Sequence, residues 1–408
     1  MDEGIAPSIG QRLREIRVWR GLSLRAAAGL AGFSASYLSM IENGKSPVDK
    51  RSTLEAFASA LRVAPSELTG VPMAGRVPDP EVSAAEATVT GIETVLTSVG
   101  FGDVAVRPRA WPEVADDLQR LNERLRPAGN YAGQGALLPG LIMELQALVC
   151  DSSAPRAAVL VGLIECYHSV VTVTRNLGVR GLPALAAWHA RRVAEELDDP
   201  AWLGLAEFLR VFSIGGDGRE RMCEVALQGA AALEPHLSDV RARQMYGALH
   251  LQASLSAAAL RQPDTAAAHL DEADGVARSL EVPTRPGPGF GSVYFGLDNV
   301  GIWRVSIAVE LGEFGWAREA ARGVVLDHVP SAARQACYWS DLGRSMAARR
   351  SSQEDAVRAL RRAEDIAAVW VRTQPLVRET VADLLRRARR DAAGRELRGM
   401  SFRMGIAG

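Results

Sequence analysis

Hydrophobic positions along most of the chain repeat with the period of an α-helix. Leu118, Leu121 and Leu125 are spaced three and four residues apart, which places them on one face of a helix. Short β-branched runs such as residues 170–173 lie inside longer helical patterns, and no hairpin turn pairs them with another strand. The pattern therefore predicts an all-α protein.

Prolines and glycines divide the chain into two parts. The segment from Gly70 to Pro80 contains three prolines and two glycines, a density that ends helices. We therefore predict a small domain over residues 1–70, a linker over 71–80 and a helical domain over 81–408. The last of these is rich in Ala, Leu, Arg and Glu, which are strong helix formers.

Three segments of the larger part follow the pattern helix, polar turn, helix. Their turns fall at residues 261–265, 312–315 and 349–353, and a small residue opens each second helix at Ala266, Ala317 and Ala356. These alanines are spaced 51 and 39 residues apart, against about 34 in an ideal tetratricopeptide repeat. The chain resembles degenerate tetratricopeptide repeats clearly over 240–370 and loosely over 140–240, and an unrelated helical bundle is the alternative. Such repeats stack into an α-solenoid whose concave face usually binds a peptide or a small molecule.

The first 70 residues carry the turn and cap signals of five short helices. Ser23 and Ser34 are candidate N-caps, and Gly32 supplies the tight turn between their helices, where a positive φ is expected. The run Ser52-Thr53-Leu54-Glu55 is a candidate capping box for a fourth helix, and a short fifth helix follows it. These signals predict the second and third helices over residues 24–30 and 35–43.

Residues 9–14, 21–24 and 32–44 together resemble the Cro/CI-type helix-turn-helix of the XRE family of regulators. The resemblance implies a five-helix DNA-binding domain whose third helix enters the major groove. In that arrangement Phe33, Leu38 and Ile41 are expected to point into the core. The family usually carries leucine at the position of Ala27, and Leu30 is expected to fill the missing volume. Over its full length the chain resembles repeat-containing XRE regulators from actinobacteria.

The resemblance also implies a set of DNA-contacting residues on and around the third helix. The residues expected at base edges are Ser34, Ala35, Ser36, Ser39, Met40 and Asn43; those expected at phosphates are Arg12, Tyr37 and Lys45, with Arg25 on the same surface. Ser and Asn can hydrogen-bond base edges, while Ala and Met offer apolar contact to a thymine methyl group. Eight basic and three acidic residues over 11–51 give a local charge of +5, which suits a phosphate backbone.

A second candidate site lies between two of the repeat segments, where a Pro/Gly-rich loop leads into an aromatic helix start. Its residues are Tyr294, Phe295, Asn299, Trp303 and Arg304. Phe295, Asn299 and Trp303 are four residues apart and so share a helix face, where two rings and an amide could hold a ligand. Arg304 is placed to meet a carboxylate or a peptide terminus. The alternative is that these aromatic residues only pack one helix pair against the next.

Composition and motifs exclude several classes of function. Lys and Arg total 47 against 48 Asp and Glu, a net charge of −1, so the whole chain is not a general polyanion binder. The four cysteines are at least 16 positions apart and the six histidines form no metal-binding motif. Gly44-Lys45-Ser46 lacks the first glycine of a phosphate-binding loop, because position 39 is serine. We therefore expect no catalytic site, no cofactor and no metal.

These observations lead to one principal hypothesis and one alternative. The principal hypothesis is a transcriptional regulator that binds double-stranded DNA as a homodimer, with a repeat domain that senses a small-molecule or peptide effector and sets dimer geometry. The alternative is a DNA-tethered scaffold whose repeats recruit a protein partner. No apolar run reaches the roughly 18 residues of a membrane span and no secretory signal is visible, so we expect a cytoplasmic protein without membrane contact.

Overall fold

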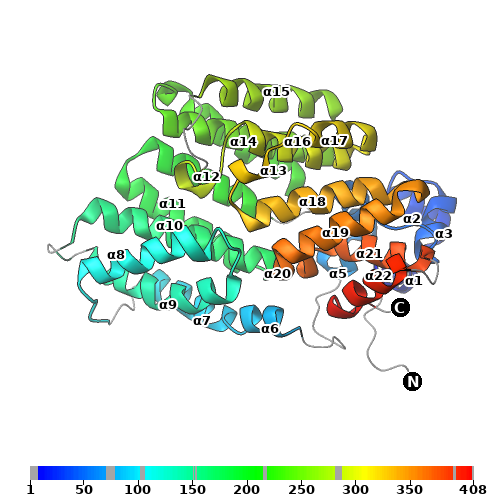
Figure 1. Ribbon diagram of the computed structural model, residues 1–408, viewed down its shortest axis with the longest axis horizontal. Coiled ribbons are helices and arrows are strands. Elements are labelled where there is room, and N and C mark those ends of the chain that lie inside the picture. Colours follow the sequence, from blue (N-terminus) through cyan, green and yellow to red (C-terminus); the bar gives the residue numbers. More distant parts are fainter. Residues whose placement is uncertain are drawn as a thin grey trace.

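The computed structural model describes residues 8–69, 79–101, 106–149, 151, 154–214, 218–280, 287–388 and 392–406. Regular structure within these ranges is entirely helical, which confirms the predicted all-α class. Residues 8–69, here called the head, form five helices, and residues 79–406, here called the body, form the rest (Figure 1). The head helices are α1 (Ile9–Trp19), α2 (Leu24–Leu30), α3 (Ala35–Glu42), α4 (Arg51–Leu61) and α5 (Pro65–Thr69).

The body is a continuous series of helices joined mostly by short turns. Its helices are α6 (Pro80–Glu86), α7 (Val89–Phe101), α8 (Trp111–Arg120), α9 (Tyr131–Leu148), α10 (Arg156–Asn176), α11 (Leu182–Leu197), α12 (Pro200–Ser213), α13 (Arg219–Leu233), α14 (Val240–Ala259), α15 (Pro263–Ser279), α16 (Leu297–Leu311), α17 (Phe314–Ala321), α18 (Ala332–Ala347), α19 (Gln353–Ile366), α20 (Ala368–Thr373), α21 (Pro375–Arg387) and α22 (Ala392–Arg403). A π-helical turn, Leu121–Leu125, continues α8.

The three predicted helical hairpins are present. They are α14 with α15, α16 with α17, and α18 with α19, and the helices of each hairpin pack side by side. Ala266, Ala317 and Ala356, near the start of each second helix, are completely buried. A larger side chain at these positions would push the paired helices apart, since protein cores are close-packed. The stacked hairpins confirm a helical repeat-like body.

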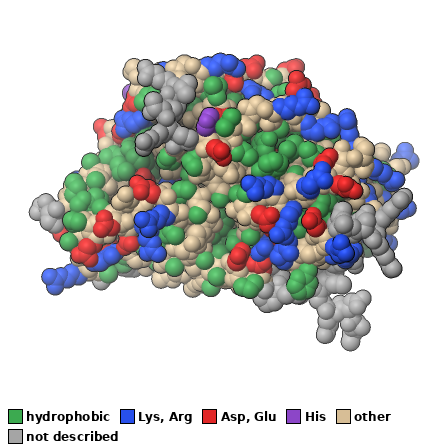
Figure 2. Space-filling view, viewed as in Figure 1, with side chains coloured by type: hydrophobic (Ala, Val, Ile, Leu, Met, Phe, Trp, Pro, Cys, Tyr) green, Lys and Arg blue, Asp and Glu red, His purple; other side chains and the backbone are tan. Residues whose placement is uncertain are grey.

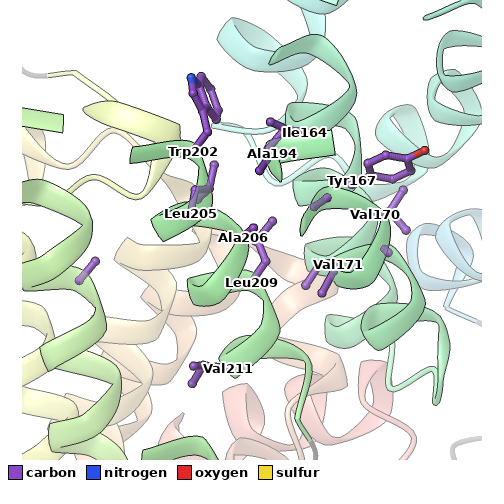
Figure 3. Close-up of a cluster of buried hydrophobic side chains, with 14 of the residues drawn as sticks. Ile164, Tyr167, Val170, Val171, Ala194, Trp202, Leu205, Ala206, Leu209 and Val211 are labelled. Carbon is purple, nitrogen blue, oxygen red and sulfur yellow. The ribbon is translucent and has the colours of Figure 1, made fainter. Parts of the chain in front are cut away.

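The largest apolar cluster runs through the body from α6 to α16. Figure 3 shows part of it, where Val171 of α10 points toward Leu209 of α12, while the Tyr167 ring lies on the opposite side of α10. Helix α10 has the length and apolar character of a membrane span, a feature that the sequence analysis did not expect, and it is the one such helix in the described part of the chain. However, 72% of its most apolar window is buried inside the protein, as befits a central core helix.

Two expectations about the head were wrong. Leu30 does not fill the space beside Ala27, because its side chain is 66% exposed at the end of α2. Residues 52–55 do not form a capping box, because α4 already begins at Arg51 and Ser52 is buried within its first turn. Helix α4 has no side-chain cap from its own N-cap residue, Lys50. The body supplies that cap, as described below.

Candidate DNA-binding surface and its attachment to the body

Helix α3 has the defined ends that its sequence predicted. The Ser34 hydroxyl accepts a hydrogen bond from the Tyr37 amide at 3.1 Å, and Gly44 leaves the helix at a φ of +67°. Gly32, in the turn before α3, has a φ of +74°, which glycine adopts without strain. Helix α1 crosses α3 closely, because a Cβ atom on Gly10 would lie 2.1 Å from the Ile41 carbonyl oxygen.

A buried ion pair fixes the angle between α1 and α3. Arg17 Nε and Nη2 donate to the two carboxylate oxygens of Glu42 at 2.6 and 2.7 Å, and Arg17 Nη1 donates to the Leu22 carbonyl. The bond to Glu42 raises the pKa of Arg17. Bidentate pairing of this kind restricts geometry as well as adding energy, so it holds α3 in place. The sequence analysis counted both residues only as surface charge.

The predicted DNA-contacting residues divide into two groups by exposure. Arg25, Ser34, Ser36, Met40, Asn43 and Lys45 are exposed, whereas Arg12, Ala35, Tyr37 and Ser39 are half-buried. Ser36, Met40 and Asn43 follow each other at spacings of four and three residues, so they line one side of α3. Asn43 Nδ2 donates to the Ser39 carbonyl at 2.7 Å and lies 3.3 Å from the Ser39 hydroxyl. One edge of α3 therefore presents a hydroxyl, a thioether and an amide to solvent.

Tyr37 lies on the other side of α3, which favours a packing role over the predicted phosphate contact. Its ring is 5.2 Å from that of Phe33, and burial raises the pKa of its hydroxyl, which hydrogen-bonds Thr53. Arg261, from the turn between α14 and α15, places its guanidinium 4.6 Å from the centre of the Phe33 ring. This side of the helix-turn-helix therefore faces the body.

Four of the eight basic residues in the counted segment make contacts within the protein, and one of them is Arg20, whose Nη2 donates to the Arg62 carbonyl at 3.1 Å. Arg17 pairs with Glu42, Lys50 Nζ donates to the Leu311 carbonyl, and Arg51 pairs with Glu310. The charge available to a polyanion is accordingly smaller than the sequence count indicated. Basic side chains nonetheless gather over the end of the molecule that the head and the C-terminal helices occupy (Figure 2).

A residue of the body provides the N-terminal cap of α4 in the head. Glu310, at the end of α16 and 2% exposed, accepts hydrogen bonds from the backbone amides of Ser52 and Arg51 at 2.9 and 3.3 Å. It also lies 3.5 Å from Arg51 Nη1. A carboxylate at a helix N-terminus satisfies free amides and the positive end of the helix dipole. Here the carboxylate comes from the other domain.

A second carboxylate of the body lies beside backbone amides of the head. Burial raises the pKa of Glu379 on α21, and the backbone amides of Ile9 and Val48 donate hydrogen bonds to its carboxylate. Ile9 is the first residue of α1. The red C-terminal helices accordingly lie beside the blue head in Figure 1. These two carboxylates make the orientation of the head dependent on the body.

Further polar contacts cross the same boundary. Arg219 Nε of α13 donates to Glu55 of α4 at 2.8 Å, and Arg344 of α18 donates to the carbonyl oxygen of Asp49. Burial raises the pKa of Glu55 to about 7, against the opposing effect of Arg219. The apolar core of the head is separate from the apolar clusters of the body. The two parts are therefore joined mainly by charged and backbone groups.

The predicted effector residues are packed inside the body. Tyr294, Phe295, Asn299 and Trp303 are each at most 8% exposed. Asn299 Nδ2 donates to the Val293 carbonyl at 3.0 Å, and its oxygen accepts from Arg334 Nε at 2.9 Å. Arg304 pairs with Asp274 at 2.8 Å. Since the amide already has protein partners, these contacts favour the packing alternative over the ligand site.

Comparison with known proteins assigns the head to a class. Residues 8–69 match the family model of a helix-turn-helix domain. The HTH-type transcriptional repressor RghR of Bacillus subtilis strain 168 is 41% identical to this chain over 56 residues, which are 14% of the chain and 42% of the repressor. The chain therefore matches less than half the length of that relative. The head is a helix-turn-helix domain of the kind found in XRE-type regulators.

A solved structure is also among the proteins that this chain resembles. The crystal structure of Bacillus thuringiensis PlcR in complex with the peptide PapR7 and DNA aligns with 67% of this chain and 95% of its own, at 12% identity and a TM-score of 0.27. A TM-score of this size supports no inference about the arrangement of the body. The helical repeat-like body is established here from its own hairpins.

Proposed function

We propose that the protein is a sequence-specific DNA-binding transcriptional regulator. One observation carries the proposal: the edge of α3 formed by Ser36, Met40 and Asn43 is exposed, while the opposite side of the helix-turn-helix packs on the body. A recognition helix must present side chains to the major groove. The docked head meets that requirement without rearrangement.

We further propose that the body senses a small-molecule or peptide effector and sets the geometry of a homodimer. The support is that Glu310 of the body caps α4 of the head and Glu379 of the body lies beside the Ile9 and Val48 amides. A change in the body would therefore move or release the head. Two heads must lie about 34–36 Å apart to read successive half-sites, so a modest movement of each head alters operator binding.

The experiment is operator selection from random duplexes with the full chain, followed by affinity measurements on variants. Ser36→Ala should relax the preferred sequence at one position, because a base contact contributes about 1–3 kcal/mol of discrimination. Lys45→Ala should weaken binding to all sequences alike and flatten the salt dependence. Arg107→Ala is the matched control, because this exposed basic residue lies in the body, before α8. Absence of any selected sequence would refute the proposal.

A further inference from the structure

Arg386 of the body lies against the turn that ends α3, the proposed recognition helix. A Cβ atom on Gly44 would lie 3.8 Å from both Cδ and Nε of Arg386, which is ordinary van der Waals contact. Gly44 follows Asn43, which belongs to the exposed edge of α3, and precedes Lys45, which is also exposed. A basic side chain of the body is therefore placed next to the surface that the head offers to DNA.

Helix α21, which carries Arg386, is held on the head by a second contact. Seven residues earlier on this helix, Glu379 accepts hydrogen bonds from the backbone amides of Ile9 and Val48. Residues seven apart lie on the same face of a helix, so one face of α21 carries both Glu379 and Arg386. The contact at Glu379 therefore keeps Arg386 beside the end of α3 while the head is docked.

The Arg386 guanidinium has hydrogen-bonding capacity to spare. Its Nη2 lies 3.5 Å from Asp383 and 3.8 Å from Glu379, whereas a strong ionic hydrogen bond measures about 2.7–2.9 Å. Each carboxylate also has other partners, since Asp383 pairs with Arg387 and Glu379 accepts the two head amides. A guanidinium group has five N–H donors. Arg386 can therefore donate to a further acceptor without giving up these neighbours.

The solvent-facing charge at this place is positive. Three basic groups, Lys45, Arg386 and Arg387, outnumber the two carboxylates, Glu379 and Asp383. The Arg386 side chain is 35% exposed, whereas those of Glu379 and Asp383 are 8% and 7% exposed. Burial also raises the pKa of Glu379. The basic groups therefore face an approaching partner, while the carboxylates lie beneath them. Basic side chains are likewise gathered over this end of the molecule in Figure 2.

The phosphate backbone of a duplex is the partner that suits this position. A recognition helix in the major groove has the sugar–phosphate strands on either side of it, and basic side chains around the helix contact their phosphates. Lys45 is predicted to make one such contact from the head. Arg386 lies one residue away, against Gly44, and brings a second donor from another domain.

We propose that Arg386 binds a phosphate of the duplex on which α3 lies, beside the phosphate bound by Lys45. The DNA-binding surface then spans head and body, and the body contributes directly to affinity only while the head is docked. Because a phosphate is the same at every base pair, this contact raises affinity for all sequences alike. The inference rests on the proposed function, since it adds a contact to the same DNA-binding surface.

The affinity of the full chain for its selected operator and for a random duplex, measured over a series of salt concentrations, tests the inference. Arg386→Ala should weaken both complexes by the same factor, about tenfold, because a hydrogen bond to a charged group is lost. The slope of log K against log salt concentration should become shallower by about 0.9, the value for one phosphate. Arg386→Lys keeps the positive charge and should therefore keep most of the slope.

Arg278→Ala is the matched control. Arg278 also pairs with a carboxylate on its own helix, Asp274 at 2.6 Å, and its side chain is 68% exposed. It lies in the last turn of α15, at the opposite end from the turn whose Arg261 touches the head. This variant should keep the affinity and the salt slope of the unaltered chain. Amide hydrogen exchange in α1 and α4 should be unchanged in Arg386→Ala, which separates a lost phosphate contact from a loosened head.

Ethylation of single operator phosphates locates the contact. Ethylation at one phosphate should stop interfering with binding when Arg386 is replaced, and that phosphate should lie beside the one whose interference depends on Lys45. If Arg386→Ala keeps affinity and salt slope while Lys45→Ala loses both, the inference is overturned and the proposed function stands. Weaker binding together with faster exchange in α1 and α4 would show that Arg386 only holds the head, which also overturns it. Failure of the unaltered chain to select any sequence refutes the proposed function, and the inference with it.

Discussion

Replacement of Glu310 by alanine tests whether the body holds the head in position. The variant removes the carboxylate that accepts from the Ser52 and Arg51 amides and pairs with the Arg51 guanidinium. Two amides at the start of α4 lose their partner, and the N-cap residue, Lys50, provides no side-chain cap. The head should therefore detach more readily from the body.

The size of the effect follows from the contacts that are lost. A missing N-cap costs about 1 kcal/mol, and a buried hydrogen bond to a charged group contributes about 1.5–3 kcal/mol. Glu310→Ala should accordingly destabilise the docked head by about 2–4 kcal/mol. Glu310→Gln keeps one acceptor oxygen but loses the charge, so its effect should be roughly half as large.

Hydrogen exchange measured segment by segment provides the assay. Amides of α1 and α4 should exchange faster in Glu310→Ala, while those of the central helix α10 should keep their protection. Glu313→Ala is the matched control, because this glutamate lies three residues further along the chain and is exposed. Unchanged exchange in α4, or equal loss of protection in head and body, would refute the view that Glu310 couples two separate units.

Three further predictions concern the boundary and the body. Burial raises the pKa of Glu55 to about 7, so the folded protein holds the proton on Glu55 more tightly than the unfolded chain does. The stability that the protonated carboxyl group contributes is present below the unfolded pKa and is lost as the pH rises to about 7. The free energy of unfolding should fall by at most about 1.4 kcal/mol per pH unit over this range. Denaturation from pH 5 to 8 should therefore be flatter for Glu55→Gln. Gly247→Ala should destabilise the body by about 1–3 kcal/mol, because the new Cβ atom would lie 2.0 Å from Phe295 Cζ. Gly275→Ala is the control, since Gly275 has open space around it, and it should leave the midpoint of thermal unfolding unchanged. Asn299→Ala should lower stability by about 1–3 kcal/mol in chemical denaturation and leave effector binding intact; loss of the response with a normal melt would restore the predicted pocket there.

Most of the head could be predicted from its sequence because its signals are local. Ser34 caps α3 and Gly32 takes a positive φ, both as expected. The fourth helix was placed slightly wrong because its cap is Glu310, 258 positions from Ser52. Local sequence holds no information about a partner at that distance. For the same reason the sequence could not show that Arg261 of the body lies near Tyr37, whose phosphate contact stays a prediction.

The body was predicted in outline, but its polar interior was not. The alanines that open the second helices identified the hairpins, because close helix packing requires small residues there. The candidate ligand stripe grouped Asn299 and Trp303 on one helix correctly, but Phe295 lies outside it, because α16 begins only at Leu297. Periodicity also cannot distinguish a buried face from the lining of a pocket. Arg334, which satisfies the Asn299 amide, comes from α18 and has no recognisable relation to it in sequence.

The few polar contacts between head and body determine how binding at the body could affect the head. If one apolar core spanned head and body, separating them would expose that core, and the protein would behave as a single rigid unit. Instead the head keeps its own apolar cluster, and Glu310, Glu379 and Arg219 make directional contacts with its backbone and charges. Each such contact contributes only about 1–3 kcal/mol, so a few groups control the balance between a docked and a released head. An effector that engages those groups need not deform the body: binding only to the docked state shifts that balance by mass action.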